Sequence, residues 1–176
     1  MVIWQPSGLV SPLPLPEEGG LDNVIAVWIP VGLDNPEGPI PDLSNLPLVD
    51  PLEASTFVTP KRAHEHASAR YALAALLRDI GLDPFDLRVV RDEHRKPNLV
   101  WRDHEAKERA GGPLSPALPE ITLGHSNGIS IAAISLNGSS IGLDAEPLDL
   151  PRARNLLTMM TSGDELQYLE QLWETD

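Results

Sequence analysis

A short segment near the middle of the chain has a pattern associated with nucleophilic catalysis. Gly124-His125-Ser126-Asn127-Gly128 fits G-x-S-x-G, which in serine hydrolases places a nucleophilic serine on a sharp turn between a strand and a helix. Here β-branched residues follow the motif, so a strand is expected in place of the helix. In that fold the catalytic histidine also follows the serine in the sequence. The five histidines of this chain are His64, His66, His94, His104 and His125, and none of them follows Ser126. A serine hydrolase is therefore the least favoured of the functions considered.

Two carboxylates shortly downstream could hold a metal ion. Asp144 and Glu146 are two residues apart in "IGLDAEP". On a strand, residues at this spacing project from the same face, so the two side chains would lie together. Carboxylate oxygens completed by water and substrate phosphates are typical ligands of Mg²⁺. The alternative interpretation is a pair of solvated carboxylates on an exposed strand.

Basic residues upstream could bind a phosphorylated ligand. Arg62 and Arg70 are eight residues apart in a predicted helix, just over two turns, and so share a face. Lys96 precedes Pro97 in a charged turn, and a predicted hairpin brings His125 near Asp144. Cations of this kind suit a polyphosphate ligand. The alternatives are a solvated helix face for the arginines and a hydrogen-bonded core residue for His125.

A metal site made from His64, Glu65 and His66 is a further alternative. Two imidazoles at i and i+2 on a helix point about 200° apart, so they do not converge easily on one ion. A solvated helix start is the favoured interpretation of this triplet.

The elements that would position these residues alternate between strands and helices. The pattern predicts strands at residues 23–31, 121–126 and 129–136, two short strands joined by a charged turn within 86–101, and a return strand at 139–147 after an Asn137-Gly138 hairpin. A long helix is expected from Ser55 or Thr59 to Ile80, because Pro60 and Gly81 are typical boundary residues. Helical composition returns after Pro151. The fold class is therefore α+β.

The composition excludes several kinds of partner. The chain has 176 residues, no cysteine and a formal net charge of −13, which argues against nucleic acid or an anionic membrane as partner. A small anionic ligand remains compatible with that charge, because surface charges are screened beyond about 10 Å. No apolar run is long enough to span a bilayer, and the N-terminal residues lack a basic region followed by an apolar core. A cytoplasmic protein is expected.

The order of these motifs resembles that of the 4′-phosphopantetheinyl transferases of the surfactin/enterobactin-activating type. The segments that carry the resemblance, in family order, are "KRAHEHASARYALAALL", "RDEHRKPNLVW", "ITLGHSNGISIAAIS" and "IGLDAEP". The last two resemble the family's strand ending in His-Ser and its G-[IV]-D-x-E motif, and they are the most specific. The resemblance covers residues from about 60 to 150.

The resemblance implies an enzyme that transfers the phosphopantetheine arm of coenzyme A to a serine of an apo acyl or peptidyl carrier protein, releasing 3′,5′-ADP. Such carriers serve fatty acid, polyketide, nonribosomal peptide or lysine biosynthesis. It also implies that Arg62, Arg70 and His125 hold the 3′-phosphate and neighbouring phosphates, with Lys96 on the phosphate or adenosine side. Ser126 would hydrogen-bond a phosphate. Asp144 and Glu146 would coordinate Mg²⁺ and, with His125, form the catalytic group.

The sequence also departs from the family pattern. The family's later Lys-Glu-Ala signature, whose glutamate is a third metal ligand, is absent from the printed sequence, and Glu165 matches only the acidic helix before it. The family fold has two similar α+β lobes with the site between them. We therefore expect an irregular segment at 1–22, a first lobe at 23–138 and the start of an incomplete second lobe at 139–176, with self-association as one way to supply the missing wall. A non-catalytic binder of coenzyme A or of a carrier protein is the alternative.

Overall fold

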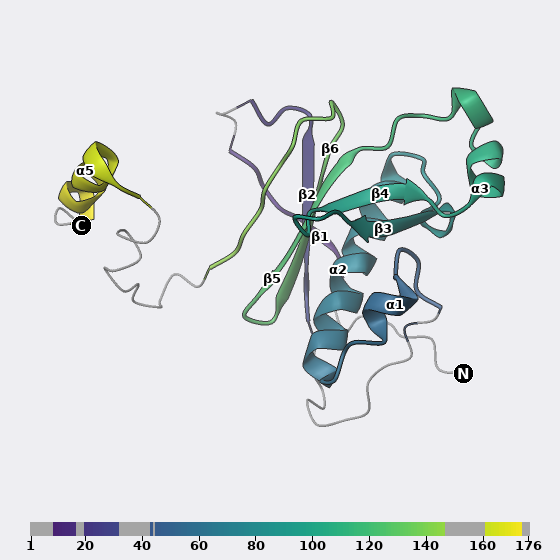
Figure 1. Ribbon diagram of the computed structural model, residues 1–176, viewed down its shortest axis with the longest axis horizontal. Helices are drawn as coiled ribbons and strands as arrows, with labels where there is room; N and C mark the ends of the chain where they lie inside the picture. Colours follow the sequence, from purple (N-terminus) through teal and green to yellow (C-terminus); the bar gives the residue numbers. More distant parts are fainter. Residues whose placement is uncertain (1–8, 17–19, 32–42, 44, 147–160, 174–176) are drawn as a thin grey trace. The chain divides into compact units, whose positions relative to one another are not determined.

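A computed structural model describes residues 9–16, 20–31, 43, 45–146 and 161–173. The chain divides at Glu146 into two compact units, which are described separately (Figure 1). The first unit combines antiparallel sheets with helices, which confirms the α+β class.

The main sheet of the first unit is antiparallel throughout. Its strands are β1 (Ser11–Pro12), β2 (Val24–Pro30), β5 (Glu120–Ser126) and β6 (Ile129–Ser135), in the order β1-β2-β6-β5. Strands β5 and β6 form a hairpin whose two-residue turn is Asn127-Gly128. Both turn residues have positive φ, 43° and 79°, the requirement of a type I′ turn and the reason that Asn-Gly suits it. The strands predicted at 23–31, 121–126 and 129–136 are thus confirmed.

Helix α2 (Pro60–Asp79) packs on one face of this sheet (Figure 1). The side chain of Thr59 caps its first turn by accepting a hydrogen bond from the backbone N–H of Arg62 at 3.4 Å. Gly81, with φ of 81°, follows its C-terminus, as expected from the sequence. The core between helix and sheet contains, among others, Ile29, Leu73, Leu76, Leu77, Ile121 and Ile134. This core fixes α2 against β5 and β6, and so fixes which side chains can meet between them.

A second, two-stranded sheet contains β3 (Leu87–Arg91) and β4 (Pro97–Trp101), joined by the charged turn that the sequence predicted. Short helical segments surround it: α1 (Pro51–Ala54), η1 (Pro84–Asp86), α3 (His104–Arg109) and η2 (Gly112–Leu114). The side chain of Asp50 caps α1 through the backbone N–H of Leu52 at 2.9 Å. The α1 segment contributes Glu53 to the site described below.

The return strand predicted at 139–147 does not form over its described residues, 139–146, which corrects the sequence interpretation. Strand β6 pairs with β2 along one edge and with β5 along the other, so neither edge is left for a further strand. Asn137 instead accepts hydrogen bonds from Ser135 Oγ at 2.8 Å and from the backbone N–H of Ser139 at 3.1 Å. Residues 139–146 continue without regular structure, yet they pass close to β5: a Cβ at Gly124 would lie 3.3 Å from the carbonyl oxygen of Leu143.

The second unit contains helix α5 (Gly163–Trp173), which confirms the helix predicted at "SGDELQYLEQLW". The helical composition at 152–160 lies outside the described residues. No helix among the described residues is long and apolar enough to cross a membrane.

Candidate functional site

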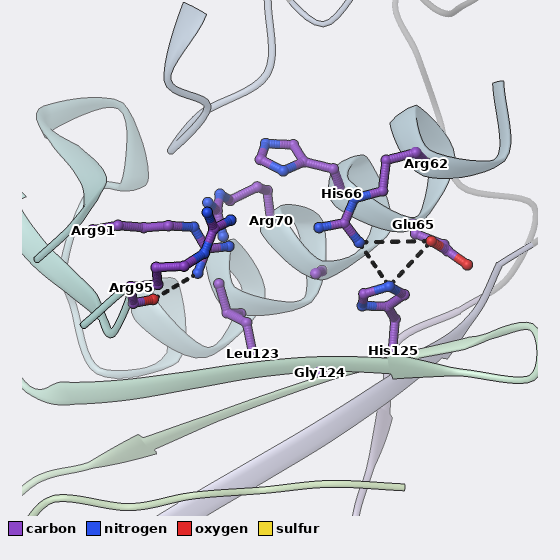
Figure 2. A pocket seen from close by; sticks show the side chains of 10 residues that line it. Arg62, Glu65, His66, Arg70, Arg91, Arg95, Leu123, Gly124 and His125 are labelled. Carbon is purple, nitrogen blue, oxygen red and sulfur yellow. Dashed lines mark hydrogen bonds and ion pairs between the residues drawn. The ribbon is translucent and has the colours of Figure 1, made fainter. Parts of the chain in front are cut away.

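A basic hollow of about 250 Å³ lies between α2, β5 and the β3–β4 turn (Figure 2). We define it by its lining residues: Arg62, Glu65, His66, Ala69, Arg70, Arg91, Arg95, Leu123, Gly124 and His125. Four of the ten are arginines and two are histidines, against one carboxylate. This concentration of positive charge stands out on a chain whose formal net charge is −13. The hollow is therefore suited to an anionic ligand.

One face of α2 supplies a row of three polar side chains to the basic hollow. Arg62, His66 and Arg70 follow one another at intervals of four residues, so they share that face (Figure 2). The hydroxyl of Ser130 on β6 donates to the carbonyl oxygen of Glu65 at 3.2 Å and ties this part of the helix to the sheet. The structure thus brings Arg62 and Arg70 together as the helical spacing predicted. His66 lies between them.

His125 meets Arg62 and Glu65 at one end of the basic hollow (Figure 2). Its Nε2 lies 2.7 Å from Nη1 of Arg62 and 3.1 Å from Oε2 of Glu65. Nε2 cannot accept a hydrogen bond from Arg62 and donate one to Glu65 at the same time. A ring without a proton on Nε2 therefore accepts from Arg62, and a ring with a proton on Nε2, neutral or charged, donates to Glu65 and releases the guanidinium. An anion bound here would interact with both cations.

Glu53 is the counter-ion at the other end of the site. Its Oε2 accepts a hydrogen bond from Arg70 Nη2 at 3.2 Å, and its Oε1 accepts one from Arg91 Nε at 3.0 Å. Burial opposes ionisation of this carboxyl, but the hydrogen bond from Arg91 and the charge of Arg70 outweigh it and lower the pKa of Glu53. One carboxylate thus neutralises only part of the arginine charge around it.

Two side chains of this cluster are buried with a nitrogen that lacks a partner. Arg70 is 2% exposed and His66 is 6% exposed. Within the part of the chain that the structure describes, Nε of Arg70 and Nε2 of His66 have no hydrogen-bond partner. Burial, opposed by Glu53, lowers the pKa of Arg70 to about 10, so the guanidinium stays charged at neutral pH. Burial and the charge of Arg70 lower the pKa of His66 to about 3, so its imidazole is neutral.

The burial of His66 predicts a loss of stability in acid. Between pH 6.5 and about 3 the unfolded chain binds a proton on this histidine and the folded chain does not, so stability falls as the pH falls. From pH 6.5 to pH 5 the expected loss is about 2 kcal/mol. Denaturant unfolding followed at several pH values should show this slope in the wild type and a shallower one in His66→Gln. The control is His94→Gln, because His94 is 84% exposed and should leave the slope unchanged.

Arg91 and Arg95 were not singled out from the sequence. Arg91 is the last residue of β3, and Arg95 lies in the turn that follows, where Asp92 Oδ1 accepts from the backbone N–H groups of His94 and Lys96, both at 2.9 Å. The charged turn was visible in the sequence, but it could not reveal that the turn folds toward α2. Arg91 Nη1 donates to the carbonyl oxygen of Arg95 at 3.0 Å, which holds the two residues together (Figure 2).

Lys96 and Ser126 do not line the basic hollow. Nζ of Lys96 lies 2.5 Å from Oε2 of Glu120 and 3.2 Å from Oγ of Ser140, so it ties the start of β5 to residues 139–146. Ser126 follows His125 along β5, and alternation directs its side chain to the opposite face of the sheet. The structure therefore separates these two residues from the predicted cation cluster.

Asp144 and Glu146 are both exposed. They lie in the irregular segment directly after Leu143, whose carbonyl oxygen passes close to Gly124. Oδ1 of Asp144 accepts from the backbone N–H of Ala145 at 2.9 Å. Because the segment is not a strand, strand alternation no longer places the two carboxylates on one face. Within the described ranges no group of three or more His, Cys, Asp or Glu residues could hold a metal ion. By donor type alone the two carboxylates suit Mg²⁺, whose remaining ligands would have to come from water and phosphate.

A comparison with protein-family models finds none that matches this chain, and a comparison with curated proteins finds no matching relative.

Proposed function

We propose that this protein binds coenzyme A in the basic hollow and transfers its phosphopantetheine arm to a serine of an apo acyl or peptidyl carrier protein. The observation that carries the proposal is the convergence of four arginines and two histidines on one hollow of an otherwise acidic chain. Coenzyme A carries a pyrophosphate and a separate 3′-phosphate, and guanidinium groups bind phosphate through paired, charge-assisted hydrogen bonds.

Each end of the basic hollow offers its own cations for binding phosphate. At one end Arg62 and His125 contact each other, and each also lies within ion-pair distance of the Glu65 carboxylate. At the other end Arg70 and Arg91 are held in place by Glu53. Cations that are fixed before the ligand arrives need not be reoriented when it binds, which is the condition for effective electrostatic stabilisation.

In the proposed reaction the serine hydroxyl oxygen of the carrier forms a bond to the phosphorus that bears pantetheine. The bond from that phosphorus to the bridging oxygen breaks, and the bridging oxygen leaves as part of 3′,5′-ADP. The serine proton passes to solvent or to a nearby base. Arginine side chains of the hollow neutralise the charge that accumulates on the leaving phosphate. Asp144 and Glu146 would hold Mg²⁺, which when bound polarises the pyrophosphate.

A non-catalytic binder of coenzyme A is the second candidate. One observation favours it: among the described residues, no group of three or more His, Cys, Asp or Glu side chains could hold a metal ion. Such a protein would retain the basic hollow and lack transfer.

The test is the intact mass of an apo carrier protein after incubation with this protein, coenzyme A and Mg²⁺. A phosphopantetheine adduct is expected, and Asp144→Ala should slow its formation by at least about tenfold because a metal ligand is lost. The matched control is Glu105→Ala, an equally acidic and exposed residue on α3, which should leave the rate unchanged. Binding of coenzyme A without any adduct would support the binder, and absence of both would refute both candidates.

A further inference from the structure

A second hollow adjoins the basic hollow. This side hollow, of about 270 Å³, is lined by Glu53, Thr56, Phe57, Val58, Thr59, Arg62 and Arg95. Arg62 and Arg95 line both hollows, so their side chains lie at the junction between them. The wall of the side hollow is partly apolar: Val58 is 87% exposed, and the Phe57 ring centroid lies 5.9 Å from the Arg62 guanidinium carbon. The basic hollow therefore supplies positive charge, and the partly apolar side hollow suits an organic group.

Arg95, which lies at this junction, has an unfavourable backbone conformation. Its φ of 64° lies in the left-handed region, where a residue with a Cβ is disfavoured by about 1–2 kcal/mol and glycine is not. The turn enforces that conformation, because the N–H of Arg95 donates to the carbonyl oxygen of Asp92 at 3.0 Å and the N–H of Asp92 donates to that of Lys96 at 3.1 Å. Strained residues of this kind are common at ligand-binding sites, and Arg95 combines the strain with a place in both hollows.

The charge around Arg95 is unbalanced. Figure 2 shows the side chains of Arg70, Arg91 and Arg95 gathered at one end of the basic hollow. Glu53 forms ion pairs with Arg70 and Arg91. No carboxylate of the described residues forms an ion pair with Arg95, so its guanidinium is the charge that remains for a ligand. Nε of the buried Arg70, which also lines the hollow, has no partner among those residues either.

We infer that Arg95 is a phosphate-binding residue at the junction of the two hollows, and that the side hollow receives the organic group to which that phosphate is attached. The ligand class is a nucleotide with two separate phosphate groups, one held at Arg95 and the other at Arg62 and His125. The choice of coenzyme A and 3′,5′-ADP as ligands rests on the proposed function; the placement of a phosphate at Arg95 rests on the geometry alone.

The test separates binding from folding through Arg95→Gly. Glycine fits the left-handed turn, so this variant should unfold at an equal or higher temperature than the wild type. Its affinity for 3′,5′-ADP, measured by calorimetry, should fall by about tenfold or more, because a hydrogen-bonded charge pair is lost. Arg95→Asn, which also tolerates this conformation, should show the same loss of affinity. The matched control Arg88→Gln removes an equal charge from an exposed position on β3 and should change affinity less than about twofold.

Each outcome decides the inference independently of the transferase proposal. Unchanged affinity in Arg95→Gly would overturn the role of Arg95, even if a carrier adduct forms. Binding that depends on Arg95, without any adduct, would support the role of Arg95 and count against the transferase. If the wild type binds neither 3′,5′-ADP nor inorganic tripolyphosphate, the inference is overturned. If it binds tripolyphosphate as tightly as 3′,5′-ADP, the organic half of the inference is overturned.

Discussion

Arg70→Met is expected to lower the free energy of unfolding by about 3–5 kcal/mol, the usual cost of removing one partner of a buried ion pair. Arg70 is 2% exposed and is among the largest fully buried side chains of the described residues. Methionine replaces much of its volume but not its hydrogen bond to Glu53 at 3.2 Å. The carboxylate would then be left half-buried with Arg91 as its remaining hydrogen-bond partner, and this end of the basic hollow would lose one of its two fixed cations.

A double-mutant cycle with Glu53→Gln distinguishes the ion pair from simple loss of packing. If the charges interact as the structure shows, the double variant should lose less stability than the sum of the two single variants, by at least about 1 kcal/mol. Denaturant unfolding of the four proteins, followed by circular dichroism, measures this difference. Additive losses would mean that Arg70 stabilises the fold through its aliphatic stem and that Glu53 is a bystander.

Local sequence patterns were sufficient for the elements whose boundaries have specific residue chemistry. Helix α2 begins at Pro60 after a threonine cap and ends before Gly81, and both signals are local. The β3–β4 hairpin and α5 were likewise visible as short patterned segments. These elements could be predicted because the interactions that bound them are made within a few residues of sequence.

Strand pairing could not be predicted in the same way. The chain contains two Asn-Gly pairs, and only Asn127-Gly128 closes a hairpin. Asn137-Gly138 has the same local chemistry, but the second edge of β6 is occupied by β2, a strand about 100 residues earlier in the sequence. That long-range pairing removes the return strand and leaves Asp144 and Glu146 in an irregular segment. Which strand pairs with this edge of β6 therefore depends on the whole sheet and not on the residues of the turn.

The residues of the candidate site, likewise, could be predicted from the sequence only where local spacing places them. Helical spacing predicted that Arg62 and Arg70 share a face. That His125 lies on the side of β5 that faces α2 is shown by the structure and was not predicted from the sequence. The sequence did not reveal Arg91 and Arg95, because their place in the hollow depends on how the β3–β4 turn packs against α2. His66 was considered only with His64, as a metal ligand, whereas it belongs with the arginines one turn away on either side.

Arg62→Ala is expected to weaken coenzyme A binding by about 100-fold, the largest loss among the substitutions of the hollow's exposed side chains. Arg62 lines both hollows and lies 2.7 Å from His125 Nε2. In the proposed complex its removal would cost a bidentate contact to phosphate, which would comprise two charge-assisted hydrogen bonds of about 1.5–3 kcal/mol each before compensation by water. Because the side chain is 41% exposed, the stability of the fold should change by less than about 0.5 kcal/mol.

Lys61→Ala is the matched control for this prediction. It removes the same charge from the adjacent residue, which is 69% exposed and does not line either hollow. Calorimetric titration with coenzyme A should show less than about twofold change for Lys61→Ala, since a screened surface charge adds little to binding. Equal losses in the two variants would mean that the helix start attracts anions only through its general charge. A loss confined to Arg62→Ala would mean that the geometry of the guanidinium beside His125 determines recognition.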